Sequence, residues 1–243
     1  MIKMKMVNGI YTFSSVLLII ALSWLTLYKV NFFYGFWHDH GGIAQTIEYF
    51  SPKNKHISNF EHTTKAERIR VFKHISYAVH IDASELNAIT FKTAKSGQAQ
   101  RFLHQREIIH LIDVSHAINT LYIILIFGVS CWLYSLRYYL RHNIKLPSRK
   151  VQLLSMAILV GLVGICIVLI GPEALFYWFH QVIFPENHQW FFYYEDSLMS
   201  TLMSAPDLFG WIAFEWLILF IAYFFVIHYL CDFLVCYRLK KKH

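Results

Sequence analysis

The stretch that decides the fold is Val151–Pro172, VQLLSMAILVGLVGICIVLIGP, which contains no charged residue. Its apolar side chains follow no alternation, so the pattern favours an α-helix over a barrel strand. Its length is enough to cross roughly 30 Å of hydrocarbon at about 1.5 Å per helical residue. Three other segments of the chain have similar length and apolar character. The sequence therefore predicts four transmembrane helices, at 7–30, 117–136, 151–172 and 208–236.

The composition agrees with a protein embedded in a membrane. Of the 243 residues, 56% are hydrophobic and only 15% are charged. A soluble domain would carry about a quarter charged residues. The aromatic share of 18% fits side chains placed in the headgroup layer. The predicted fold class is an all-α, polytopic membrane protein with one membrane-embedded domain over residues 1–243.

The distribution of charge predicts the orientation of the spans. Basic residues precede the first span, lie between the second and third, and follow the fourth: Lys3, Lys5, Arg137, Arg141, Lys145, Arg149, Lys150, Arg238, Lys240, Lys241 and Lys242. The 172–210 segment has carboxylates but no Lys or Arg. The positive-inside rule then places both termini in the cytoplasm. The net charge of +7 is largely this signal and does not indicate nucleic-acid binding, since no soluble module carries a basic cluster.

Two regions are then expected outside the cytoplasm, at 31–116 and 173–207. In the first, Ile43–Phe50 has helical spacing, and Thr64–Glu67 reads as a capping box that opens a helix to about His80. Ser96-Gly97 is a predicted break. A further helix is expected to start near Ala99 and continue into the second span. The region 31–116 is therefore predicted to be a small helical domain, and 173–207 a long loop.

Ionisable residues gather at the extracytoplasmic ends of three predicted spans. Glu107, His110 and Asp113 have i, i+3, i+6 spacing, which places them along one helix face. Glu173 and His180 lie seven residues apart at the end of the third span, and share a face if that helix continues. Glu215 lies just inside the fourth span. A carboxylate near a histidine can fix the tautomer of the imidazole and raise its basicity. The pattern therefore favours histidine acid–base chemistry at one depth, the surface of the outer leaflet.

Motifs for other chemistries are missing from the sequence. Among the 14 histidines there is no His-Glu-x-x-His, and the Glu-x-x-His of di-iron bundles occurs once, at Glu107–His110, where two copies are needed. We therefore expect no metal and no cofactor. Neither Gly-x-Ser-x-Gly nor Ser-x-x-Lys occurs. The cysteines all fall in or at the ends of spans, and no extracytoplasmic disulfide is expected: Cys131, Cys166, Cys231 and Cys236.

Several residues within the spans are interpreted as structural. His228 and Asp232 have i, i+4 spacing and are expected to pair inside the bundle. Gly128, Gly161 and Gly164 are expected to allow close packing of helices.

Several motifs together resemble the lipoprotein intramolecular transacylase family. Glu107-Ile-Ile-His110-Leu-Ile-Asp113-Val is similar to its Glu-x-x-His-Leu-x-Asp-Val entry into the second span. The stretch FHQVIFPENHQWFF at 179–192 is similar to its His-x-x-Phe-Phe … Trp-x-Phe segment. Asp196-Ser-Leu198, Pro206–Phe209 and Glu48-Tyr49-Phe50 also agree, so the resemblance covers essentially the whole chain.

The resemblance implies an activity and a site. Such enzymes move the sn-2 acyl chain of a diacylglyceryl-cysteine lipoprotein to the cysteine α-amino group and give an N-acyl lyso-form lipoprotein. It implies that His110 and His180 are catalytic, and the helical spacing adds Glu107 and Asp113 as catalytic partners. We expect His110 to be the base, because these carboxylates raise its basicity. Substrate contacts are expected from Glu173, Trp190, Phe191, Asp196 and Glu215, and Phe192 is expected to line the acyl or glyceryl pocket with the other two aromatic residues.

Some points stay open at this stage. Gln181 stands where the family often has Glu, and Asp207 stands where Glu is usual, so the chain departs from the family pattern at two carboxylate positions. A histidine-dependent membrane metallohydrolase and a non-enzymatic membrane scaffold are the alternative functions. The expected location is the cytoplasmic membrane, with the site on the extracytoplasmic side and membrane lipids and a diacylated lipoprotein as partners. The sequence does not give the oligomeric state.

Overall fold

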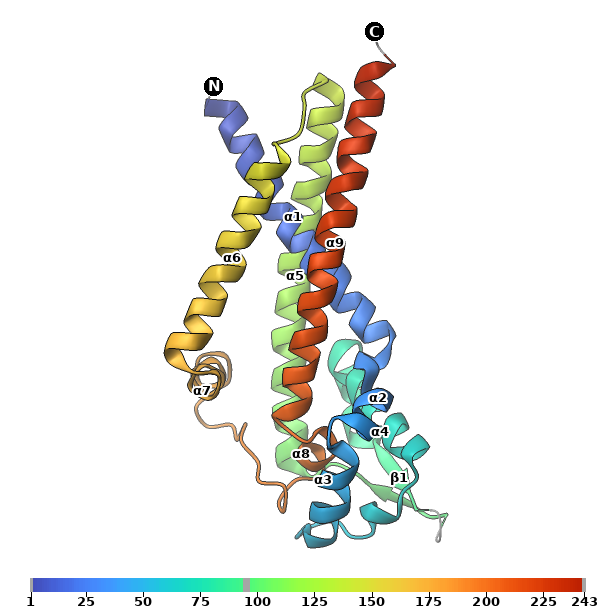
Figure 1. The fold of residues 1–243 in the computed structure, drawn as a ribbon. Helices are drawn as coiled ribbons and strands as arrows, with labels where there is room; N and C mark the ends of the chain where they lie inside the picture. Colours follow the sequence, from blue (N-terminus) through green and yellow to red (C-terminus); the bar gives the residue numbers. More distant parts are fainter. Residues whose placement is uncertain (1, 94–96, 242–243) are drawn as a thin grey trace. The chain divides into compact units, whose positions relative to one another are not determined.

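The computed structural model describes residues 2–93 and 97–241, and it is mostly helical (Figure 1). Its α-helices are α1 (Ile2–Lys29), α2 (Tyr34–His40), α3 (Ile43–Phe50), α4 (Lys65–His80), α5 (Gln105–His142), α6 (Arg149–Ile170), α7 (Pro172–Ile183), α8 (Leu198–Met203) and α9 (Asp207–Lys240). Short 3-10 helices occupy Asn31–Phe33, Ser51–Lys53, Phe60–His62 and Ala83–Ala88. Two strands, β1 (Thr90–Lys92) and β2 (Ala99–Arg101), complete the described elements.

Four of these helices are long and apolar enough to cross a membrane. They are the candidate spans Met4–Lys29, Gln105–His142, Lys150–Ile170 and Asp207–Lys240. Each contains most of one predicted span, so the prediction of four membrane helices agrees with the structure. The helix α5 begins well before the predicted span 117–136, because its polar first turns continue the same helix, whereas α9 stays close to the predicted bounds 208–236.

The chain divides into two compact units. The first comprises Met1–Leu25, Leu121–Phe179 and Leu217–His243, and the second comprises Thr26–Thr120 and His180–Trp216. The helices α1, α5, α7 and α9 each contribute residues to both units.

In the first unit, parts of α1, α5, α6 and α9 pack together. A Cβ on Gly128 of α5 would lie 2.7 Å from Cβ of Leu17 of α1, so this glycine lets two helices approach closely. Ile19 packs with Phe220 and Phe224 of α9. A Cβ at Gly161 or Gly164 would meet nothing within 4 Å, so the prediction that these two glycines serve helix packing was wrong.

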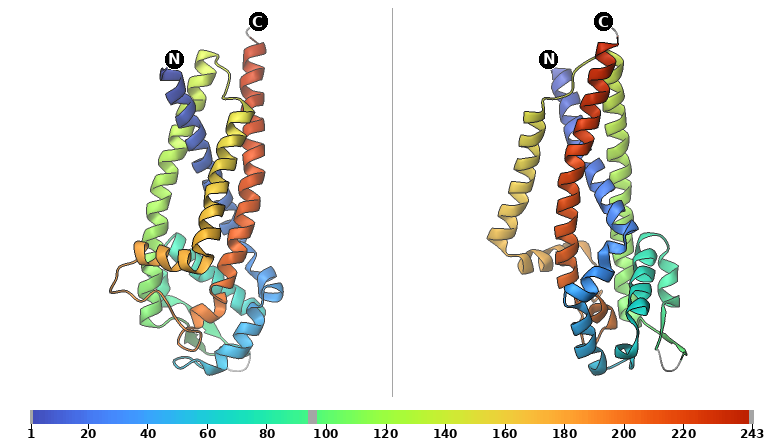
Figure 2. Two further views of the ribbon diagram at one scale, coloured as in Figure 1. Left: turned by 60° about the vertical axis from the view of Figure 1, so that its left-hand side comes forward. Right: turned by 45° about the vertical axis from the view of Figure 1, so that its right-hand side comes forward.

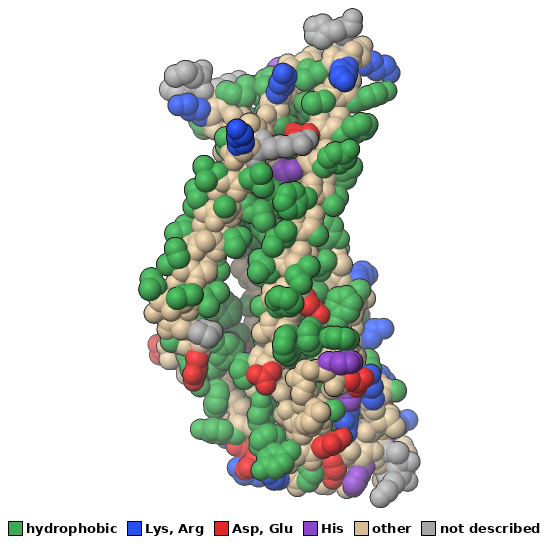
Figure 3. Space-filling model, in the orientation of Figure 1, with side chains coloured by type: hydrophobic (Ala, Val, Ile, Leu, Met, Phe, Trp, Pro, Cys, Tyr) green, Lys and Arg blue, Asp and Glu red, His purple; other side chains and the backbone are tan. Residues whose placement is uncertain are grey.

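The segments of the first unit that carry basic residues lie at one end of that unit. The start of α1, the connection between α5 and α6, and the end of α9 lie at the same end of this unit (Figures 1 and 2). Lys and Arg side chains gather there, and hydrophobic side chains cover the helices below it in the view of Figure 3. The basic segments of the sequence pattern, as far as the structure describes them, therefore lie at one end of the unit in space as well.

In the second unit, α2, α3, α4 and α8 pack beside one another. Thr64 caps α4, since its side chain accepts a hydrogen bond from the backbone N–H of Glu67, which confirms the predicted start of this helix. The amphipathic helix α3 has the predicted bounds. It buries Ile43 and Ile47 completely, and the chain leaves it before Pro52.

A small hairpin replaces the start of a predicted helix. β1 and β2 pair antiparallel, with Phe91 opposite Gln100, and α5 begins only at Gln105. The predicted helix start near Ala99 was therefore wrong. Gly97 has a φ of 62°, which suits glycine, while Ser96 lies outside the described residues.

The third span does not continue into the following segment. Gly171, with a φ of 87°, ends α6, and Pro172 opens α7 as a separate helix. Glu173 and His180 therefore share a helix seven residues apart, as expected, but this helix is α7 rather than an extension of the span.

Candidate active site

Two predicted histidines from different helices lie against the same phenyl ring in the second unit. His110 comes from the first part of α5, and His180 comes from α7. The ring centroid of Phe184 lies 5.0 Å from that of His110 and 5.3 Å from that of His180. His110 is 9% exposed, and its Nδ1 has no hydrogen-bond partner among the described residues. The structure thus brings together the two residues that the sequence singled out.

Burial decides the chemical form of His110. Its ring is packed between Phe184 and Phe192, with a centroid distance of 5.9 Å to the latter. A charged imidazolium would be costly in this apolar environment, so the neutral ring is favoured. A neutral imidazole has one nitrogen with a free lone pair and one N–H, and it can accept or donate a proton. An unpaired buried nitrogen is also a group that a substrate could satisfy.

Glu107 does not contact His110 through its carboxylate oxygens. The side chain is fully buried, and Oε1 accepts hydrogen bonds from Ser197 Oγ at 2.5 Å and from the backbone N–H of Met199 at 3.1 Å. Oε2 accepts from the backbone N–H of His104 at 2.7 Å, which caps the first turn of α5. No direct contact therefore supports the expectation that Glu107 raises the basicity of His110. The hydrogen bonds of Glu107 instead hold α8 against α5.

Asp113 has a partner that the sequence analysis missed. Its Oδ2 lies 2.7 Å from Nδ1 of His188, in the loop between α7 and α8. A carboxylate can only accept a hydrogen bond, so Nδ1 of His188 carries the proton in this pair. Asp113 follows His110 by one helical turn, so the pair belongs to the same cluster.

The loop that contains His188 is tied to α5 and to the segment after α3. Arg106 Nη1 donates to Gln189 Oε1 at 3.3 Å, and the backbone N–H of Lys55 donates to the carbonyl of Glu195 at 2.9 Å. Lys55 Nζ also lies 2.8 Å from Asp196 Oδ1, and this hydrogen bond holds the pKa of Asp196 below its usual range. Asp196 therefore anchors the loop, and its carboxylate faces Lys55.

The predicted aromatic contacts divide into two kinds. Trp190 lies 4.8 Å from His180 between ring centroids, so it lines the histidine cluster. Phe191 is 42% exposed and touches Trp190 and the ring of Tyr193. Phe192 is buried beside His110. Trp190 and Phe192 therefore form walls of the cluster, and Phe191 forms its outer edge.

Two predicted carboxylates have other surroundings. Glu215 Oε1 accepts a hydrogen bond from Trp37 Nε1 at 2.7 Å, and the ring of Trp37 stacks on Trp211 at 4.4 Å. Glu215 Oε2 is buried and has no hydrogen-bond partner among the described residues. Glu173 lies in the part of α7 that belongs to the first unit, and its side chain is exposed. Glu215 is therefore engaged by Trp37, and Glu173 belongs to a different unit from the two histidines.

The structure adds three residues to the predicted site: Phe184, His188 and Ser197. The sequence offered one weak signal for His188. This residue follows His180 by eight positions and lies in the aromatic segment after Pro185. Nothing in the spacing linked it to Asp113. In the described part of the chain, no three His, Cys, Asp or Glu side chains lie together as ligands for a metal ion.

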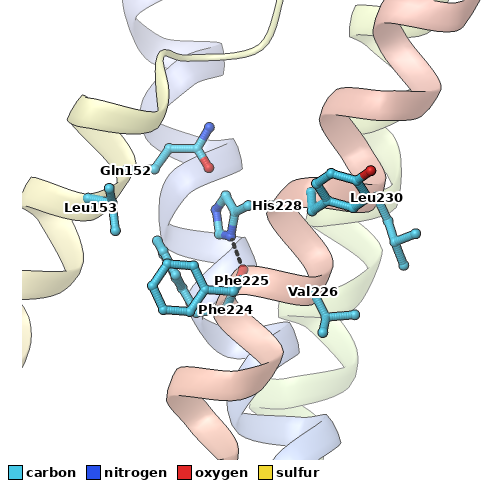
Figure 4. A pocket seen from close by; sticks show the side chains of 8 residues that line it. Gln152, Leu153, Phe224, Phe225, Val226, His228 and Leu230 are labelled. Atoms are coloured by element: carbon cyan, nitrogen blue, oxygen red, sulfur yellow. Dashed lines mark hydrogen bonds between the residues drawn. The ribbon is translucent and has the colours of Figure 1, made fainter.

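The first unit contains a pocket that none of the predicted site residues lines. Its volume is about 430 Å³, and Figure 4 shows Gln152 and His228 facing each other beside Phe224. His228 Nδ1 donates to the carbonyl of Phe224 at 2.7 Å, so a pairing with Asp232 stays a prediction for the other ring nitrogen.

Comparison with known proteins gives the family. The sequence profile of the lipoprotein intramolecular transacylase Lit matches residues 9–205, most of the chain. This chain belongs to the Lit family. The protein is therefore an acyltransferase of the lipoprotein transacylase class. No curated protein sequence matches it closely enough to add to this finding.

Solved structures agree on the fold. The membrane-integral lipoprotein intramolecular transacylase Lit from Bacillus cereus is 18% identical, with a TM-score of 0.64 over 98% of this chain and 96% of that chain. A variant of the same Bacillus cereus protein, with a histidine replaced by arginine, is 19% identical, with a TM-score of 0.66 over 98% and 92%. With four apolar helices of spanning length, the Lit family member described here is a multi-pass membrane protein.

Proposed function

We propose that this protein transfers the sn-2 acyl chain of a diacylglyceryl-cysteine lipoprotein to the α-amino group of the same cysteine. The product is an N-acyl lyso-form lipoprotein. Family membership supports lipoprotein transacylation in general. The roles proposed for the two histidines rest on one observation. Two imidazoles from separate helices contact the ring of Phe184, and Nδ1 of His110 is buried and unpaired.

The reaction needs orientation and the movement of one proton. The amine attacks the ester carbonyl, the C–N bond forms, the C–O bond to glycerol breaks, and the proton lost by nitrogen ends on the glycerol oxygen. Donor and acceptor belong to one molecule, so holding them together removes most of the entropic barrier. His110, buried and neutral, takes the proton from nitrogen, and His180 assists by protonating the leaving oxygen or stabilising the charge that develops on it.

The remaining predicted residues have supporting parts in this proposal. Trp190 and Phe191 line the path of the acyl or glyceryl groups. Glu107 and Asp196 hold the loop that carries these rings, through Ser197 and Lys55. Asp113 orients an imidazole. Glu173 and Glu215 are proposed to contact the polar part of the substrate, and Glu215 Oε2 offers a buried acceptor for a donor group.

The site is proposed to face the extracytoplasmic leaflet of the cytoplasmic membrane. Basic residues gather at the end of the first unit where the termini lie, and the positive-inside rule assigns such an end to the cytoplasm. Regions 31–116 and 173–207 then lie outside the cytoplasm. A diacylated lipoprotein whose acyl chains remain in the outer leaflet would reach the histidine cluster from that side.

Mass spectrometry tests the proposal directly. The purified protein is incubated with a diacylated lipopeptide that has a free N-terminal amine. Intramolecular transfer leaves the mass unchanged, and fragmentation should show an N-acylated cysteine and a lyso glycerol. His110→Ala and His180→Ala should each lower the rate by about 100-fold or more, since general acid–base groups contribute on that order. The exposed His62 offers a matched control, and His62→Ala should retain full activity.

Two results would contradict the proposal. One is a wild-type reaction that leaves only the free amine. The other is a rate within threefold of wild type for both site variants.

A further inference from the structure

A third imidazole lies at the histidine cluster and carries no role in the reaction as written. His188 is held by Asp113 at 2.7 Å between Nδ1 and Oδ2. Because the carboxylate accepts the Nδ1 proton, the lone pair of the neutral ring sits on Nε2. The side chain of His188 is 32% exposed and that of Asp113 is 11% exposed. His188 therefore combines a fixed tautomer with access to water.

The reaction needs one proton transfer in which neither His110 nor His180 has been given a role, the deprotonation of the substrate ammonium. The N-terminal amine of a peptide has a pKa of about 7.7–8.0, so at pH 7 only roughly a tenth of it is the free base. An ammonium group has no lone pair and cannot attack an ester. One proton must leave the substrate before the transfer begins, in addition to the proton that passes from nitrogen to oxygen during it.

The burial of the groups indicates which one can remove this first proton. His110 is 9% exposed and packed between two phenyl rings, so a proton accepted there has no direct route to water. His188 is more exposed and can release a proton to solvent after each turnover. Asp113, which binds His188, follows His110 by one turn of α5, so both imidazoles can face one substrate.

We propose that His188 accepts the proton of the substrate ammonium through Nε2, while Asp113 holds its ring, and that this step prepares the amine for transfer at His110 and His180. The inference rests on the proposed function. In the step, the N–H bond of the ammonium breaks, an N–H bond forms on Nε2, and the substrate keeps the electron pair as a neutral amine. The proton then passes to water, and His188 returns to its neutral form.

The segments that carry the candidate site also carry other charged and titratable groups. Arg106, Asp113 and His110 lie on α5, His180 lies on α7, and Glu186 lies in the same loop as His188. Arg106 is engaged by Gln189, the residue after His188.

A pH profile tests the inference. Initial rates of N-acyl product formation are measured from pH 5.5 to 9.5 for wild type and His188→Gln. The variant must use substrate that is already deprotonated in solution. We expect it to be at least tenfold slower than wild type at pH 6.5, and within threefold of wild type at pH 9, where nearly all the amine is free.

The chain supplies a matched control in the same unit. His74 lies 3.3 Å from Glu85, which makes another imidazole–carboxylate pair of partial exposure. His74→Gln should leave the rate and its pH dependence unchanged. If His188→Gln does not elute as folded protein, Asp113→Asn is measured in its place. Loss of the carboxylate removes the hydrogen bond that orients the His188 ring, so the rate should fall with the same pH dependence.

The outcomes separate the two proposals. A loss of equal size at every pH would show that His188 only supports the loop, and no loss at pH 6.5 would show that it is not needed; either result overturns the inference. A wild-type protein that forms no N-acyl product at any pH would overturn the proposed function itself.

Discussion

The carboxylate of Glu107 offers the sharpest test of what holds the candidate site together. It accepts hydrogen bonds from Ser197 Oγ, from the backbone N–H of Met199 and from that of His104. Ser197 in turn accepts from the backbone N–H of Ser200, so one buried carboxylate organises the first turn of α8. Glu107→Ala removes this acceptor without adding a new group.

The size of the effect follows from these contacts. A hydrogen bond to a charged group contributes about 1.5–3 kcal/mol, and an unpaired buried donor costs about 1–3 kcal/mol. Water can reach the half-buried His104, so the main loss comes from the donors of Met199 and Ser197. We expect the local opening of α8 to become easier by about 3 kcal/mol in Glu107→Ala. Each 1.4 kcal/mol is about tenfold, so this corresponds to roughly 100-fold.

Hydrogen exchange followed by mass spectrometry measures this opening. In Glu107→Ala, amides in peptides that cover 198–203 should exchange roughly 100-fold faster than in wild type. Glu107→Gln keeps one carbonyl acceptor but turns an NH2 group toward a donor, so a smaller acceleration of about tenfold is expected. Glu195→Ala, which removes an exposed carboxylate from the same loop, should change exchange by less than twofold.

One result would refute the reasoning. If Glu107→Ala accelerates exchange at 198–203 by less than threefold while the protein remains folded, the carboxylate does not hold α8, and the loop over His110 must be positioned by its other tethers.

Three further predictions concern stability. Gly128→Ala should lower the thermal unfolding midpoint, through overpacking worth about 1–3 kcal/mol, whereas Gly161→Ala, with open space around its Cβ, should leave it unchanged or raise it. Burial lowers the pKa of His80, so the stability from its neutral form is complete above its unfolded pKa of about 6.5 and is lost as pH falls through the folded pKa. Wild type should lose up to about 1.4 kcal/mol per pH unit below pH 6.5, and His80→Phe should lose less; equal losses in denaturation from pH 7.5 to 5 would contradict this. Lys55→Ala should leave the free energy of unfolding close to that of wild type in the same assay, because its ion pair with Asp196 is exposed.

Local features of the sequence were sufficient for much of the fold. A membrane span needs only a run of about 20 apolar residues, so all four could be located without knowing their neighbours. The start of α4 at Thr64 was equally local, since a cap and its acceptor lie within one turn. The hairpin was missed because strands of three residues are too short to show a period of two.

The sequence by itself determined which residue types the site contains. His110 and His180 were chosen from their motifs, and the structure places both beside Phe184. Only the tertiary structure decided their partners. Asp113 binds His188 across 75 positions, and Glu107 binds Ser197 across 90. The physical reason is that helical spacing governs contacts within a turn or two, whereas these contacts depend on the path of the loop between α7 and α8, which is set by buried hydrogen bonds distant in sequence.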